Sequence, residues 1–118
     1  MTGYIVFAHG SSVESANVAV RQVARDMARR GSLEIVEAAF LEQGQPDLAG
    51  AVRKIAARVS RVVVVPYFLT LGLHLKRDLP QLVEAVRAAH PDLEIEVTPP
   101  LDGHPAMADV LLARALAR

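Results

Sequence analysis

The chain has 118 residues, of which 52% are apolar and only 4% aromatic, and its 13 basic residues are balanced by 13 acidic ones. This size and composition predict a single domain, residues 1–118, around an aliphatic core, and the lack of a basic excess argues against a nucleic-acid partner. The absence of cysteine excludes disulfides and thiolate metal sites, so any bound metal must be held by imidazole, carboxylate or water.

The first part of the chain predicts a strand, a helix and a second strand. Residues 4–8 form a short apolar run typical of a strand buried on both faces, and residues 33–41 form the second strand. Between them, Ser11 and Glu14 fit a capping box at the start of a helix that ends at Gly31.

The next part repeats this alternation. Pro46 suits the first turn of a second helix, which leads to the most strand-like run of the chain, residues 61–65. Residues 66–76 are predicted to form a long and unusually apolar loop, and Asp78 is predicted to be the N-cap of the third helix.

A fourth strand at residues 93–97 and a last helix from about Pro105 to the C-terminus complete a βαβαβαβα pattern. Such alternation predicts a single flavodoxin-like α/β domain of three layers, with a four-stranded parallel sheet between helices. The simplest strand order is 2-1-3-4, which places the ligand crevice at the switch point between the first and third strands.

Two histidines, His9 and His74, each follow one of these two strands. We therefore expect them to face the same crevice, where a pair of imidazoles suits a metal or proton-transfer site. Taken singly, His9 is equally consistent with a buried turn residue, and His74 with a residue that only precedes a helix. Glu42, after the second strand, is placed to approach the same crevice as a proton acceptor or ligand, or else is a solvated loop residue.

Other residues near this crevice suit a ligand with acidic and apolar parts. Gly10 permits a tight turn, and Ser11 and Ser12 lie where a helix N-terminus binds anions. The cations Lys76 and Arg77 suit acidic groups of a ligand, although each singly is also typical of a solvated helix approach. The third loop, with Phe68, Leu69 and Leu73, is apolar enough to form either a pocket wall or a subunit contact.

The remaining signals are largely negative. His90, near a helix C-terminus, and His104, near a helix start, are predicted to be structural. Dinucleotide, P-loop and nucleophile-elbow motifs are absent. No apolar run is long enough to cross a bilayer and no signal peptide is recognised, so we expect a cytoplasmic protein without a membrane partner.

Taken together, three motifs resemble those of the small sirohydrochlorin chelatases, which are class II tetrapyrrole chelatases, over nearly the whole chain. They are Ala8-His9-Gly10-Ser11, Ala39-Phe40-Leu41-Glu42, and the run from Pro66 to His74 with Asp78-Leu79-Pro80. One departure is that Ser12 stands where the family often has arginine, which removes a substrate-carboxylate contact.

The resemblance implies insertion of Co²⁺ or Fe²⁺ into sirohydrochlorin during cobalamin or sirohaem biosynthesis. It implies that His9 and His74 bind the metal or accept pyrrole protons, that Glu42 assists, and that no cofactor beyond the metal substrate is needed. By analogy with longer, two-domain relatives, it also implies that the short chain forms a homodimer around a tetrapyrrole substrate.

Two other functions fit part of the pattern. A phosphohistidine phosphatase or mutase also has His-Gly after its first strand, but it usually has arginine before the histidine, where this chain has Ala8. A non-catalytic metal carrier would use the same histidines and would bind metal without turnover of a tetrapyrrole.

Overall fold

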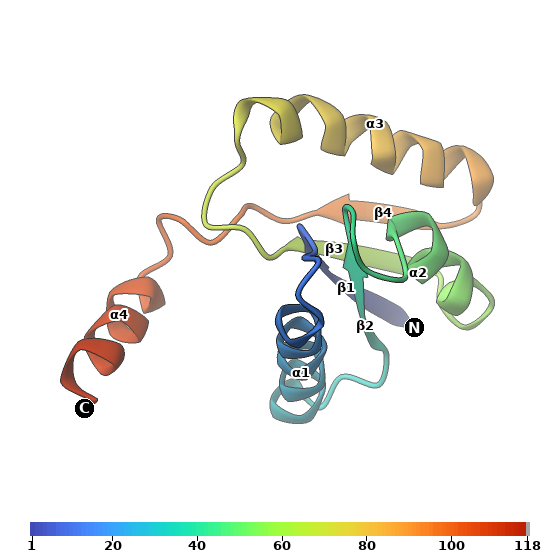
Figure 1. Cartoon of the computed structure of the whole chain (residues 1–118). Helices are drawn as coiled ribbons and strands as arrows, with labels where there is room; N and C mark the ends of the chain where they lie inside the picture. The colour runs from blue at the N-terminus through green and yellow to red at the C-terminus, as the bar shows by residue number, and fades with distance from the viewer. Residues whose placement is uncertain (118) are drawn as a thin grey trace.

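The computed structural model, in which residues 1–117 are described, contains a four-stranded parallel sheet in the order β2-β1-β3-β4 (Figure 1). The strands are β1 (Thr2–Ala8), β2 (Val36–Phe40), β3 (Arg61–Pro66) and β4 (Glu94–Val97). The predicted alternation and strand order are confirmed. Strands β1 and β3 pair directly, with Val6 opposite Val65, so their carboxyl ends lie side by side at the switch point.

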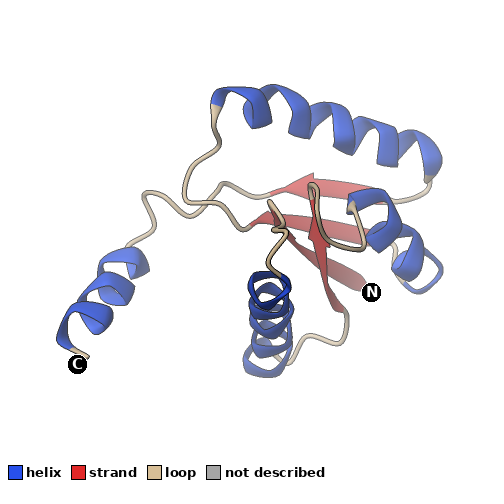
Figure 2. Ribbon diagram, in the orientation of Figure 1, coloured by secondary structure: helices blue, strands red, loops and turns tan. Residues whose placement is uncertain are grey.

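Helices lie on both faces of the sheet, as the colouring by secondary structure makes visible (Figure 2). Helix α1 (Glu14–Gly31) packs on β1 and β2 from one side. On the other side, α2 (Leu48–Ile55), continued by a 3₁₀ turn, packs on β1 and β2, and α3 (Leu73–Ala89) packs on α2 and β4. Helix α4 (Ala106–Leu116) stands apart from the rest (Figure 1).

The hydrophobic core is divided by the sheet into two clusters because alternate side chains of a strand point to opposite faces. The larger cluster lies beneath α2 and α3 and includes Ile5 and Phe7 of β1. The smaller one lies beneath α1 and includes Val6 and Phe40. Phe7 and Phe40 are fully buried, one in each cluster, so each side of the sheet has an aromatic ring in its core.

The predicted capping box at the first helix is wrong. Helix α1 begins at Glu14, and its N-cap, Val13, makes no side-chain cap hydrogen bond. Ser11 lies earlier, in the loop, where its hydroxyl accepts from the Val13 N–H at 3.0 Å. In the second helix the cap is Asp47, whose carboxylate accepts from Gly50 at 2.8 Å, so Pro46 precedes the helix and does not form its first turn.

The predicted loop over residues 66–76 is also too long, and Asp78 is not an N-cap. Helix α3 already begins at Leu73 and contains Asp78 and Pro80 in its interior. The physical reason is the apolar face of the helix, since Leu75 and Leu79 lie one turn apart and both are buried in the larger cluster. Burial of these leucines outweighs the local preference of proline for the first turn.

The remaining elements agree with the sequence except at their ends. Strand β1 begins two residues earlier than predicted, and β2 and β4 are shorter than predicted. Among residues 1–117, no helix combines the length and apolar character required to cross a membrane.

The early start of α3 predicts a specific pattern of stability. We expect Leu79→Ala to lower the free energy of unfolding by about 2–5 kcal/mol because it leaves a cavity in the larger cluster. Leu73→Ala, on the same helix but 84% exposed, is the matched control and should change it by less than about 0.5 kcal/mol. Urea denaturation measures both, and equal losses would contradict the assignment of the buried face.

Candidate functional site

His9 and Glu42 are brought together by backbone pairing that continues beyond the ends of two strands. The Leu41 N–H donates to the Ala8 carbonyl at 2.9 Å, and the Glu42 N–H donates to the His9 carbonyl at 3.0 Å. Both bonds extend the parallel register of β1 and β2, in which Ala8 lies opposite Phe40. The first residues of the two loops therefore lie beside each other at the carboxyl edge of the sheet.

The side chains of this pair are in contact. His9 Nε2 lies 3.4 Å from Glu42 Oε1, and each side chain is 59% exposed. On the other side of the ring, Nδ1 lies 3.1 Å from the carbonyl oxygen of Gly10. Because a carbonyl oxygen only accepts, Nδ1 carries the hydrogen in this contact, which leaves Nε2 to accept a proton or bind a cation beside Glu42.

Glycine is required at position 10. Its backbone has a φ of +91°, which L side chains rarely adopt. A Cβ atom there would lie 1.7 Å from the carbonyl oxygen of Glu42. The close approach of the two loops, and with it the contact between His9 and Glu42, therefore depends on Gly10.

Asn17, which was not predicted to be a site residue, connects the same two loops through hydrogen bonds of its side chain. It is the one polar residue found in the interior of the described chain, with 1% exposure. Its amide group donates to the carbonyls of Ser11 at 2.8 Å and Gln43 at 3.0 Å, and its oxygen accepts from the Ser11 N–H at 2.9 Å. The sequence signal that could have indicated a buried asparagine is its spacing of three and seven residues from Val20 and Ala24, which belong to the apolar face of the helix.

Arg21, one turn further along α1, secures the loop after β2. Its guanidinium donates to Glu14 at 2.7 Å and to the Gln45 carbonyl at 3.3 Å, and it stacks over the Phe40 ring at 5.2 Å. The hydrogen bond from Arg21 also holds the pKa of the Glu14 carboxyl below its usual value. Helix α1 thus supports both loops of the site through polar side chains.

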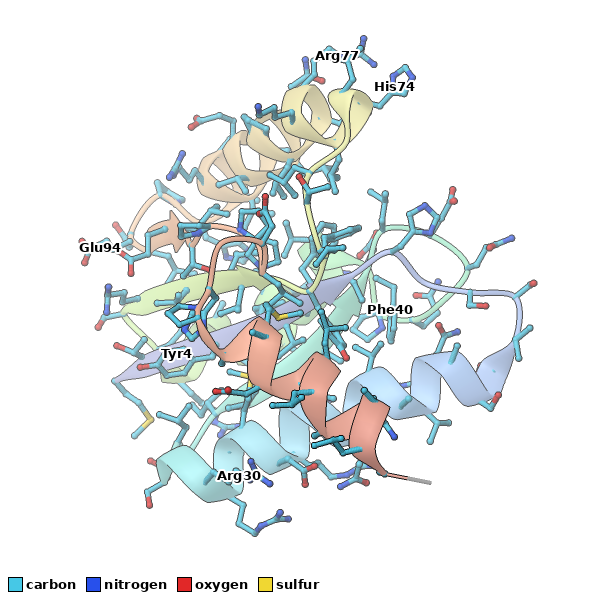
Figure 3. The ribbon with its side chains drawn as sticks, turned by 90° about the vertical axis from the view of Figure 1, so that its left-hand side faces the viewer. Tyr4, Arg30, Phe40, His74, Arg77 and Glu94 are labelled. Atoms are coloured by element: carbon cyan, nitrogen blue, oxygen red, sulfur yellow. The ribbon has the colours of Figure 1, made fainter. Side chains whose placement is uncertain are left out.

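His74 lies in the first turn of α3 rather than in a loop, as Figure 3 shows with the neighbouring Arg77. Arg77 Nη2 lies 3.4 Å from His74 Nδ1, and Arg77 Nε donates to Asp78 at 3.1 Å. His74 and His9 both line a pocket of about 280 Å³. Its other lining residues are Leu41, Phe68, Gly72, Leu73, Leu75 and Asp78.

The structure therefore places the two predicted histidines on one pocket, with Phe68 and Leu73 as apolar walls. Gly10 and Ser11 adjoin it through the His9 loop, and Ser12 is exposed at the end of that loop. Two other candidates lie away from it. Leu69 is 62% exposed outside the pocket, and Lys76 lines a separate hollow between α3 and Val97.

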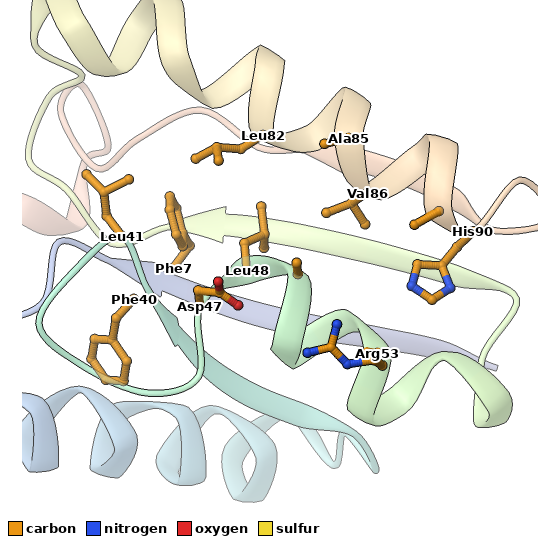
Figure 4. A pocket seen from close by; sticks show the side chains of 12 residues that line it. Phe7, Phe40, Leu41, Asp47, Leu48, Arg53, Leu82, Ala85, Val86 and His90 are labelled. Atoms are coloured by element: carbon orange, nitrogen blue, oxygen red, sulfur yellow. The ribbon is translucent and has the colours of Figure 1, made fainter.

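A second pocket, of about 190 Å³, lies between α2 and α3 (Figure 4). It is lined mainly by packing residues such as Leu48 and Val86, with Arg53 and His90 at its rim, and it shares only Leu41 with the histidine pocket. His90 ends α3, and His104 Nδ1 accepts from the Ala106 N–H at 3.0 Å before α4. Both histidines thus lie outside the candidate site.

The donor set of the site is small. Within residues 1–117 there is no group of three or more histidine, cysteine, aspartate or glutamate side chains placed to hold a metal ion. Two exposed imidazoles and one carboxylate suit transient handling of a divalent ion and of protons, rather than a permanently held structural metal.

Fold and site together define a flavodoxin-like α/β protein with a histidine pocket at the switch point of its sheet. Residues 3–117 match the model of the CbiX family. The chain therefore belongs to the CbiX family, as the motifs predicted.

Two curated relatives are sirohydrochlorin cobaltochelatases. The one from Methanopyrus kandleri is 36% identical over 84 residues, which are 70% of this chain and 59% of the relative. The one from Methanosarcina barkeri is 31% identical over 114 residues, which are 94% of this chain and 88% of the relative. These names agree with the chelatase interpretation and not with the phosphotransfer or carrier alternatives.

Solved structures agree on the fold. A cobalamin (vitamin B12) biosynthesis CbiX protein from Marinobacter aquaeolei is 29% identical, with a TM-score of 0.81 over 98% of each chain. The sirohydrochlorin chelatase SirB from Bacillus subtilis in complex with cobalt is 20% identical, with a TM-score of 0.87 over 97% of this chain and 49% of SirB. At that identity, the likeness to SirB concerns the fold alone.

The role of Asn17 in holding the two loops together through hydrogen bonds can be tested by substitution. We expect Asn17→Ala to lower the free energy of unfolding by about 1–3 kcal/mol because three backbone groups lose their partner. Ser12→Ala, in the same loop but exposed, is the control and should have little effect. Urea unfolding measures the stability of both variants, and NMR of the His9 ring reports on the position of its loop. An unchanged His9 signal in Asn17→Ala would contradict the role of Asn17 in holding the two loops together.

Proposed function

We propose that this protein inserts a divalent metal, Co²⁺ or Fe²⁺, into sirohydrochlorin for cobalamin or sirohaem biosynthesis. The observation that carries the proposal is the placement of His9 and His74 on one pocket, with Glu42 in contact with His9. The names of the curated relatives support the tetrapyrrole substrate and favour cobalt. In this proposal the metal is a substrate, and no other cofactor takes part.

The residue types suit the reaction. Two pyrrole N–H protons must leave as the metal enters, so the site needs bases that exchange protons near neutral pH. His9 Nε2 accepts one proton and Glu42, 3.4 Å away, stabilises the resulting imidazolium. His74, exposed at the start of α3, binds the incoming metal or takes the second proton, and an imidazole releases a divalent ion readily.

The surroundings of the histidines suit a flat macrocycle with carboxylate side chains. Phe68 and Leu73 offer apolar walls to the ring. Arg77, beside His74, binds a substrate carboxylate, with the Gly10 backbone at the opposite side, whereas the backbone groups of Ser11 are already bonded to Asn17. Leu69, Lys76 and Ser12 lie further out and contact only the periphery of a ligand of this size.

A single copy of the domain, residues 1–118, is proposed to provide only half of the binding cleft. The histidine pocket is about 280 Å³, which lies just below the range of about 300–1,000 Å³ for pockets of drug-sized ligands. A tetrapyrrole is larger than such a ligand. We therefore propose a cytoplasmic homodimer, in which the second copy covers the exposed side of the macrocycle, without nucleic-acid or membrane partners.

The proposal is tested by absorbance under anaerobic conditions. Sirohydrochlorin is mixed with Co²⁺ or Fe²⁺, with and without the protein, and the spectral change of metal insertion is followed. We expect acceleration over the spontaneous rate, and a decrease of about 10²–10⁴-fold in the catalysed rate for His9→Ala and for His74→Ala. Glu42→Gln should lower the rate less because it leaves the imidazole in place.

His90→Ala is the control, since His90 lies outside the histidine pocket. It should retain the parent rate. Failure to accelerate insertion of either metal would rule out the chelatase reaction, and metal binding without turnover would indicate a carrier.

A further inference from the structure

Helix α4 is predominantly apolar and is almost uncovered in the described chain, where only its Met107 is partly buried. None of its residues is buried, and Val110, Leu111, Leu112 and Leu116 are 52–73% exposed. Asp109 and Arg114 are its only charged residues. A helix of 11 residues is marginal in water without tertiary packing, and one that is predominantly apolar is normally enclosed. Helix α4 therefore requires a surface to cover it.

The segment before α4 holds the helix away from its own domain. The Leu101 N–H donates to the Phe68 carbonyl at 3.0 Å, and the Asp102 N–H donates to the Leu69 carbonyl at 2.7 Å. These bonds tie the base of α4 to the loop that borders the histidine pocket. The chain is accordingly extended, with a longest dimension of 48 Å and a radius of gyration of 14.6 Å, against about 13.5 Å for a compact domain of this length.

One strip of the sheet is left without a covering helix. On the face where α1 packs on β1 and β2, no described helix packs on β3 or β4. We call this face of β3 and β4 the open strip. It carries Arg61, Val63, Val65, Glu94 and Glu96, because their neighbours Val62, Val64 and Ile95 face the larger core cluster. Val63 is buried at 6% exposure, so the strip is open mainly at Val65, which is half-buried, and along the two exposed glutamates.

We infer that α4 of one copy packs on the open strip of a second copy, and that the exchange is reciprocal. The inference rests on the homodimer of the proposed function, but not on its reaction. The same chain carries an uncovered helix and an uncovered strip, so a two-fold exchange covers both in each copy. A different protein bound to either α4 or the open strip would leave the second of these surfaces exposed.

Charge and area agree with a second copy as the occupant. Arg61 lies opposite Glu94 in the register and forms an ion pair with Glu96, so the strip carries one net negative charge that suits Arg114. Half the lateral surface of an 11-residue helix, about 16 Å long and 10 Å wide, is about 250 Å². Two helices and two strips then bury about 1,000 Å², which is the lower limit for a specific interface.

Cross-linking tests this exchange directly because the chain has no native cysteine. Leu112→Cys on α4 and Glu94→Cys on the open strip are made as separate full-length variants, both at exposed positions. The two are mixed, left to exchange subunits, and treated with a short bis-maleimide. We expect a covalent heterodimer on a denaturing gel. Gln81→Cys, exposed on α3 at the opposite face, replaces Glu94→Cys in the control mixture and should give none.

A chain that carries both Leu112→Cys and Glu94→Cys separates exchange from folding back. Links between chains support exchange, whereas links only within one chain would show that α4 covers its own strip. Sedimentation velocity of the unmodified chain gives the oligomeric state independently. A dimer without the α4-to-strip link would overturn the exchange alone, a monomer would also overturn the homodimer, and neither result bears on chelatase activity.

Discussion

The site depends on hydrogen bonds that continue the pairing of β1 and β2 past their ends. The bonds from Leu41 to Ala8 and from Glu42 to His9 hold two loops in parallel register. Parallel strands place their carboxyl ends at the same edge, so this pairing delivers an imidazole and a carboxylate to one point. Gly10 makes the close approach sterically possible, and Asn17 satisfies the polar groups that the approach would otherwise leave buried.

Much of this arrangement could be predicted from the sequence. Alternating patterns and short apolar strands predict the parallel sheet and its order, and that order places His9 and His74 together before any contact is known. The contribution of Asn17 could not be predicted in this way, because its partners are backbone groups up to 26 residues away that have no sequence signature. The position of Lys76 was not predicted either, because it depends on the early start of α3, which places this side chain in a hollow separate from the histidine pocket.

Errors arose where local signals and packing disagree. Asp78 followed by Leu79 and Pro80 is typical of a helix start, yet Leu75 and Leu79 extend the buried face and the helix begins at Leu73. As a result, His74 and Arg77 stand on a rigid helix turn and contact each other, which a loop would not ensure. The exposure of α4 could not be predicted either, because a predominantly apolar helix has the same sequence pattern whether its cover comes from its own chain or another.

The central claim is that His9 and His74 share one pocket that handles the metal. The most direct measurement is NMR of the four histidine rings during addition of substoichiometric Co²⁺, whose paramagnetism broadens nearby signals. The account predicts that the signals of His9 and His74 broaden together while those of His90 and His104 stay sharp. Broadening centred on His90 or His104, or equal broadening of all four rings, would contradict it.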